Sequence, residues 1–159
     1  ERRLMSRATF LDDIAMSLGG YVAEELIFGD VTTGPSNDLQ VSTSLARAMV
    51  TRWGMSDAIG PVALESDGGK IIHGYVDGGK DYSEEMSAVI DREVKKIMTD
   101  SLELARKTIG ENKKVLDAIA KKLLEVETLE QDEYNKLIMT FGIKPKKREE
   151  GKEAIDIVG

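Results

Sequence analysis

The sequence predicts a mostly helical bundle with a short irregular or β-hairpin insertion. Aromatic residues make up only 5 % of the 159 residues, and the chain is rich in the residue types that favour helices. Between residues 86 and 109, apolar side chains recur at spacings of three and four, which is the period of an amphipathic helix. Residues 62–75 depart from that period, so one non-helical insertion is expected among the helices.

A first helix is expected to start near Ser6 or Thr9, either of which suits an N-cap, and to run to about Ile27. Its apolar residues at helical spacing are Leu11, Ile14, Ala15, Leu18, Val22 and Leu26. Two glycines, Gly19 and Gly20, cost roughly 1 kcal/mol each against alanine inside a helix. The apolar phase continues through them, so one helix is expected rather than two.

A second helix is expected from about Ser36 to Trp53, after a turn with the sequence TTGP. It carries two apolar stripes, one of Val41, Leu45, Ala48, Met49 and Trp53 and the other of Leu39, Ala46 and Val50. Two stripes predict a helix enclosed on two sides.

The rest of the chain predicts a weak hairpin and three further helices. Residues 62–65 and 70–76 flank the turn-like sequence SDGG, which favours a short hairpin or an irregular flap. Ser83 is expected to cap the third helix, which ends at Gly110, and a fourth follows over about 115–124. A capping box of Thr128 and Gln131 predicts a last short helix. We expect one domain over residues 1–142 and a disordered tail over 143–159.

Charge and composition exclude several classes of function. The net charge of −7 argues against nucleic-acid partners, which are bound through clustered Lys and Arg, and against anionic membrane surfaces. With no cysteine, the chain can form no disulfide and no thiolate metal site. The apolar run over residues 14–28 is interrupted by two glycines and two glutamates, so no membrane contact is expected from this segment.

Three sets of polar residues could carry chemistry. His73, the single histidine, lies in the expected hairpin and is interpreted as a surface residue. Glu24 and Glu25 are adjacent on a helix and point about 100° apart, so at most one faces a site and both could simply be solvated. Asp38 sits where the TTGP turn meets the second helix, and its plain interpretation is a carboxylate that favours a helix start. The residues alone leave both interpretations of Asp38 open.

Residues 17–64 closely resemble the peptidase domain of FtsH, the membrane-anchored ATP-dependent zinc metalloprotease family. The matching stretches are Leu18–Gly20, Ala23–Glu25, Thr32–Gly34, Ser36–Asp38, Ala46–Arg47, Met49–Thr51, Gly54–Ser56 and Gly60–Pro61. The sequences IDREVKKI and LLEVETLEQDEYNKLI also resemble the family's C-terminal helices. The resemblance therefore extends over nearly the whole chain except its last residues.

The resemblance implies that Asp38 is the third zinc ligand of the intact protein. In the family, two histidines of a His-Glu-x-x-His helix supply the other ligands, and the glutamate between them is the general base. The turn from Thr32 to Asn37 would then orient Asp38, with Thr33, Asn37 and Glu24 as candidates for supporting residues. The resemblance also implies ATP and Mg²⁺ bound by an upstream ATPase domain, a homo-hexamer, and unfolded membrane and soluble proteins as substrates.

This chain departs from the family pattern because it contains neither a His-Glu-x-x-His helix nor a Walker motif. We therefore expect a fragment that holds one zinc ligand and no catalytic residue, is inactive alone and is soluble. The parent would be membrane-anchored, with its peptidase domain on the cytoplasmic side in bacteria or inside an organelle. The alternative is a noncatalytic helical assembly or adaptor module from a parent that lacks the catalytic helix.

Overall fold

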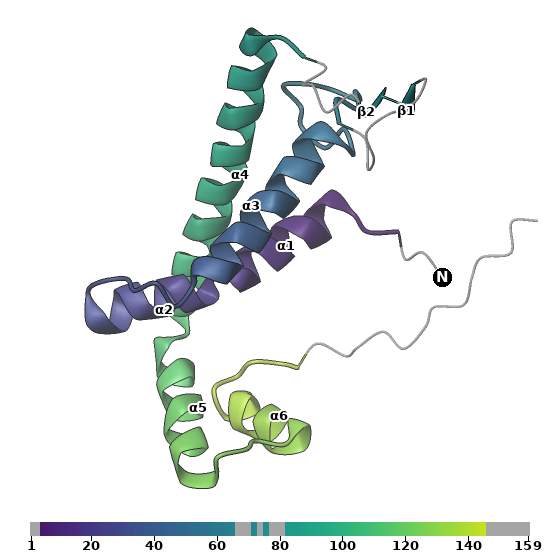
Figure 1. The fold of residues 1–159 in the computed structure, drawn as a ribbon. Coiled ribbons are helices and arrows are strands. Elements are labelled where there is room, and N and C mark those ends of the chain that lie inside the picture. Colours follow the sequence, from purple (N-terminus) through teal and green to yellow (C-terminus); the bar gives the residue numbers. More distant parts are fainter. Residues whose placement is uncertain (1–3, 66–70, 73–74, 77–81, 146–159) are drawn as a thin grey trace, which may run out of the picture. The chain divides into compact units, whose positions relative to one another are not determined.

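The structure, a computed structural model, describes residues 4–65, 71–72, 75–76 and 82–145. Within them the chain forms six helices and one pair of very short strands, which confirms the predicted helical class (Figure 1). The chain divides into two compact units, Glu1–Glu111 and Asn112–Gly159, and each is described by itself. The expected domain end at residue 142 stays a prediction. The expected tail lies, after residue 145, outside the described residues.

The first unit holds four helices and the strand pair. In chain order its elements are α1 (Arg7–Ser17), α2 (Gly19–Phe28), α3 (Ser36–Thr51), β1 (Ile71–Ile72), β2 (Tyr75–Val76) and α4 (Glu84–Glu111). Helix α4 packs against α1, α2 and α3, and α1 also packs against α3, which runs in the opposite direction (Figure 1). The buried core consists of Ile14, Leu18, Val22, Ala46, Met49, Val50, Ile90, Ile97 and Ala105. The long helix α4 therefore supplies the surface on which the other three helices assemble.

Two helices, α1 and α2, stand where one continuous helix was predicted, so that prediction is wrong. Leu18 separates them with φ −76° and ψ −5°, a turn that tightens the end of α1. The two glycines that follow Leu18 destabilise a continuous helix at this point. A local turn is therefore little less stable than the helix that it replaces. The Leu18 N–H still donates to the Ile14 carbonyl at 3.0 Å, and the Val22 N–H donates to the Leu18 carbonyl at 3.1 Å. The buried face consequently continues across the break.

The starts of three helices show which predicted caps form. The Thr9 N–H donates to Ser6 Oγ at 3.2 Å, so of the two predicted caps of the first helix Ser6 is confirmed and Thr9 is not. The Met86 N–H donates to Ser83 Oγ at 3.2 Å, which confirms the cap predicted at Ser83. Helix α3 begins at Ser36, as predicted, and follows Pro35.

Helix α3 packs against two other helices, but one of its two predicted apolar stripes is only partly covered. Its buried side chains are Ser42, Ala46, Met49, Val50 and Thr51. In contrast, the side chains of Val41 and Trp53 are 55 % and 45 % exposed. Helices α1 and α4 cover adjoining faces of α3, and the stripe that includes Val41 is left partly in solvent. The helix ends at Thr51, two residues before the predicted end.

The hairpin pairs different residues from those predicted. Ile71 pairs with Val76 and Ile72 with Tyr75 in antiparallel register, so both strands lie within the sequence KIIHGYV. Residues 64 and 65 do not join this sheet, because their N–H groups both donate to the Thr51 carbonyl, at 2.7 and 3.1 Å. The SDGG segment and His73 lie outside the described residues.

The second unit consists of α5 (Lys113–Val126) and α6 (Gln131–Thr140), which pack against each other. Their buried apolar side chains in the described part are Val115 and Ile138. The predicted capping box is wrong, because the N-cap of α6 is Glu130 and not Thr128. Thr128 instead belongs to the turn after α5, where its N–H donates to the Val126 carbonyl at 2.6 Å.

Candidate functional site

The turn between α2 and α3 leads directly to Asp38. Helix α2 ends at Gly29, whose φ of 70° is a left-handed conformation that glycine adopts without steric cost. The Val31 N–H then donates to Asp30 Oδ1 at 2.8 Å. The chain reverses over these residues and enters the segment Thr32–Pro35.

Glu24 holds this turn against α2. Its Oε2 accepts hydrogen bonds from the Thr32 N–H at 2.9 Å and from the Thr32 hydroxyl at 3.0 Å. The Thr32 hydroxyl oxygen in turn accepts from the Gly34 N–H at 3.0 Å. Hydrogen bonds to a charged acceptor are among the stronger ones in proteins, so one carboxylate of α2 fixes the course of the turn.

Gly34 allows this carboxylate to approach the turn closely. A Cβ atom at position 34 would lie 3.0 Å from Glu24 Oε1 and 3.2 Å from Thr32 Oγ1. Any larger residue would therefore have to displace the Glu24 carboxylate or the Thr32 hydroxyl. The threonine and glycine of the turn thus have a local explanation that does not depend on a ligand.

Asp38 lies in the first turn of α3 and is exposed. Among the described residues, its carboxylate has no hydrogen-bond or ion-pair partner. A carboxylate at this position stabilises a helix by roughly 0.3–1 kcal/mol through the helix dipole. The group is consequently both favourable to the helix and free to bind an external cation.

The three residues that were predicted to support Asp38 lie in different surroundings. Glu24 contacts the turn that precedes Asp38, as described above. Thr33 contributes its backbone carbonyl, which accepts from the Ser36 N–H at 3.2 Å, and its side chain is exposed. Asn37 is also exposed on α3. The hydroxyl that Glu24 binds belongs to Thr32, which the sequence could have indicated, because Thr and Gly two positions apart are typical of a side-chain-stabilised turn.

Glu25 points to a different partner from Glu24. Its two carboxylate oxygens accept from Arg106 of α4, Oε2 from Nε and Oε1 from Nη2, each at 2.9 Å. The hydrogen bonds from Arg106 lower the pKa of Glu25 below its ordinary value. The predicted divergence of the two glutamates is confirmed, but neither is simply solvated: Glu24 fixes the turn and Glu25 joins α2 to α4.

The described residues do not make up a complete metal centre. They include no group of three His, Cys, Asp or Glu side chains that could hold a metal ion. A catalytic zinc ion usually has three protein ligands and one open position. Asp38 is exposed at the end of a fixed turn and has no partner in the described part of the chain, so its carboxylate is accessible from solvent.

A known family matches the chain across most of its length. The sequence profile described as peptidase family M41 matches residues 1–137.

This chain belongs to peptidase family M41.

Relatives of this M41 chain carry the name ATP-dependent zinc metalloprotease FtsH, which confirms the resemblance stated above. The relative from Trieres chinensis is 46 % identical over 151 residues, which cover 92 % of this chain and 23 % of the relative. The relative from Acholeplasma laidlawii is 46 % identical over 137 residues, which cover 85 % of this chain and 21 % of the relative. The relative from Bacillus subtilis is 40 % identical over 140 residues, which cover 87 % of this chain and 22 % of the relative.

The M41 chain spans less than a quarter of the length of these relatives. In the part of the chain that the structure describes, no helix is both long and apolar enough to cross a lipid bilayer.

Proposed function

We propose that this chain is part of the peptidase domain of an ATP-dependent zinc metalloendopeptidase that degrades unfolded membrane and soluble proteins. The longer protein that would contain it is called the intact enzyme below. The family match and the names of the relatives support this proposal. The observation that carries it is the exposed Asp38 carboxylate, which has no partner among the described residues and lies at the end of a turn that Glu24 fixes.

In this proposal Asp38 is the third ligand of the zinc ion. The other two ligands and the general base would come from a His-Glu-x-x-His helix elsewhere in the intact enzyme. A carboxylate from a separate element can complete a zinc centre whose first two ligands lie one helical turn apart. The chain's own part is then to hold the Asp38 carboxylate in a constant position, which the hydrogen bonds of the turn support.

The remaining features of the proposal rest on the resemblance to FtsH alone. They are ATP and Mg²⁺ bound by a separate ATPase domain, anchorage in a membrane, and a homo-hexamer of peptidase domains that encloses the cleavage sites. The peptidase domain would face the cytoplasm in a bacterium or the interior of an organelle. Protein chains are the expected substrates, and nucleic acids are not.

Removal of zinc tests the proposed activity. We expect the intact enzyme to cleave casein in the presence of ATP, to lose this cleavage on treatment with a zinc chelator, and to regain it when zinc is returned. ATP hydrolysis measured in the same samples is the control. Casein cleavage that persists in metal-free enzyme would contradict the proposal.

Replacing Glu24 by Gln tests the support of Asp38. Residues that orient metal ligands commonly contribute about 10–100-fold to metal affinity, so we expect Glu24→Gln to weaken zinc binding by the intact enzyme within that range. Glu25→Gln is the matched control, because the neighbouring glutamate binds Arg106 instead of the turn. Competition with a fluorescent zinc chelator measures both variants. Equal affinities in Glu24→Gln and Glu25→Gln would contradict the role of Glu24.

A further inference from the structure

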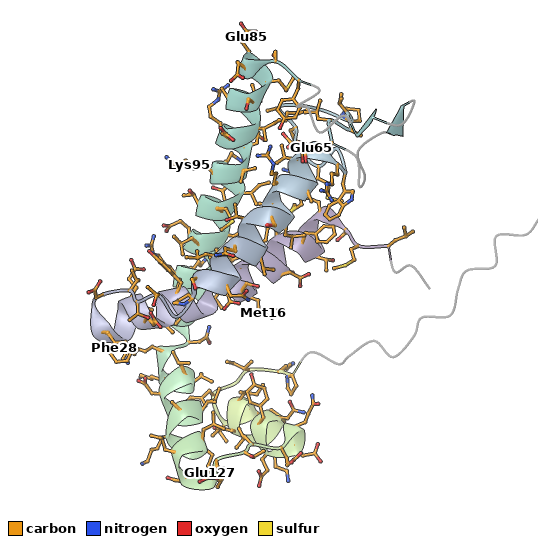
Figure 2. All side chains as sticks on the ribbon, viewed as in Figure 1. Met16, Phe28, Glu65, Glu85, Lys95 and Glu127 are labelled. Carbon is orange, nitrogen blue, oxygen red and sulfur yellow. The ribbon has the colours of Figure 1, made fainter. Side chains whose placement is uncertain are left out.

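Four residues meet at the C-terminal end of α3, away from the Asp38 turn. They are Arg47, Thr51, Glu65 and Tyr82, called the Glu65 cluster below. Glu65 lies beside this end of α3 (Figure 2). Thr51 lies thirteen positions after Asp38 on the same helix, a rise of roughly 20 Å at 1.5 Å per residue. The cluster therefore has no part in the proposed zinc site, and the inference below does not depend on it.

The Glu65 carboxylate accepts hydrogen bonds from three side chains. Its Oε1 accepts from Arg47 Nη2 at 2.9 Å and from the Tyr82 hydroxyl at 3.0 Å. Its Oε2 lies 3.0 Å from the Thr51 hydroxyl, whose single proton is shared with the Arg47 carbonyl at 2.9 Å. Arg47 Nη2 also donates to the Tyr82 oxygen at 2.7 Å. Both carboxylate oxygens thus have hydrogen-bond partners, and Glu65 joins α3 to Tyr82, two residues before α4.

The backbone beside Glu65 is attached at the same place. The N–H groups of Leu64 and Glu65 both donate to the carbonyl of Thr51, whose side chain is fully buried. Residues 65 and 82 are the ends of a segment that contains β1 and β2. The cluster brings these two ends together and fastens them to α3.

The charges around Glu65 determine how the cluster responds to acid. Arg47 faces it from α3, Tyr82 from the segment before α4, and Asp91 of α4 lies 4.0 Å from Arg47 Nη1. Burial alone would raise the pKa of Glu65, but the hydrogen bonds from Arg47, Thr51 and Tyr82 outweigh it and lower the pKa below its ordinary value. The ionised Glu65 carboxylate therefore stabilises the cluster fully at pH values above the ordinary pKa of a glutamate. This stabilisation is lost as the pH falls through the lowered pKa of Glu65.

We propose that the Glu65 cluster is an acid-released clamp, in which protonation of the Glu65 carboxylate detaches residues 64–65 and Tyr82 from α3 while the packed helices stay folded. A protonated carboxyl group lacks the charge that attracts Arg47. Its oxygens accept weaker hydrogen bonds from the hydroxyl groups of Thr51 and Tyr82. None of the four cluster side chains belongs to the buried core of the helices, although Leu64 and Tyr82 pack against this core as partly buried side chains. The fully buried apolar residues that join the helices lie outside this attachment, so it can open as a local unit once the hydrogen bonds to Glu65 weaken.

Amide hydrogen exchange of the 159-residue chain tests the clamp. In Glu65→Gln we expect the protection factors at positions 64 and 65 to fall by about tenfold or more, because the hydrogen bonds lost involve a charged group. Amides of Met49 and Ile97, in the core of α3 and α4, should keep their protection. Tyr82→Phe, which removes only one hydroxyl, should cause a smaller fall at the same two positions. Glu111→Gln, at an exposed glutamate at the end of α4, is the matched control.

A pH series provides the second arm of the test. Protection at positions 64 and 65 of the unsubstituted chain should fall as the pH drops below the ordinary pKa of a glutamate and through the lowered pKa of Glu65, whereas in Glu65→Gln it should already be low and independent of pH. Unchanged protection at both positions in Glu65→Gln would overturn the proposal. An equal loss of protection over all helices would also overturn it, because the cluster would then open only with the whole unit.

Discussion

Replacing Asp38 by Asn in the intact enzyme is expected to lower casein cleavage by at least about a hundredfold while leaving ATP hydrolysis nearly unchanged. Replacing a residue that merely orients a metal ligand commonly lowers metal affinity or activity about 10–100-fold. The loss of a ligand itself should lower them at least as much. Asn keeps the size of the side chain but removes its charge. Initial rates of casein cleavage and of ATP hydrolysis, measured on the same preparation, give the two values.

The effect of Asp38→Asn is not expected to arise from unfolding. The contribution of a carboxylate in a first helical turn is roughly 0.3–1 kcal/mol, which is small against the total stability of a domain. Asp12→Asn is the matched control, because Asp12 is an exposed carboxylate on α1. A similar loss of cleavage in both variants, or full cleavage by Asp38→Asn, would contradict the assignment of Asp38.

Replacing Ile90 by Ala is expected to destabilise the first unit by about 2–5 kcal/mol, the range measured when large aliphatic side chains are truncated in protein cores. Ile90 is fully buried on α4, at the surface on which the other three helices assemble. The loss combines the transfer free energy of the removed methyl groups with the cavity that they leave. A change of this size is a large fraction of the total stability.

Urea denaturation followed by the fluorescence of Trp53 measures the loss in Ile90→Ala. Trp53 is the single tryptophan and stacks on Phe10 of α1 with ring centroids 4.7 Å apart, so it reports on the first unit. Ile27→Ala is the matched control, because Ile27 is 47 % exposed at the end of α2. Its cost should stay near the few tenths of a kcal/mol typical of surface positions. Equal costs at the two positions would contradict the packing described for α4.

Local signals in the sequence predicted the helices and two of their caps. The Ser6 and Ser83 caps were predictable because an N-cap depends on residues within one helical turn. The long helix α4 was predictable because its apolar period extends over many residues. The break at Leu18 was not predicted, because the apolar period continues across it. Whether the helix breaks there depends on how the destabilising effect of the two glycines compares with the packing of the two helices on the rest of the unit.

The candidate site was predictable only in part. The resemblance to FtsH indicated Asp38 and Glu24, but it did not indicate that Glu24 binds Thr32 rather than Thr33. The ion pair of Glu25 with Arg106 joins residues 81 positions apart, and the Glu65 cluster joins residues of three different segments. Contacts of this kind depend on how helices pack, and no spacing within one helix indicates them.

The zinc content of the intact enzyme tests the role of Asp38 most directly. Elemental analysis after dialysis against a moderate chelator should find about one zinc ion per protomer in the unsubstituted enzyme and in Asp12→Asn. Asp38→Asn should retain less than about a tenth of that amount, in line with the loss of a ligand. Asp38→Asn protein that keeps its full zinc content and cleaves casein at the unsubstituted rate would show that Asp38 is not a ligand.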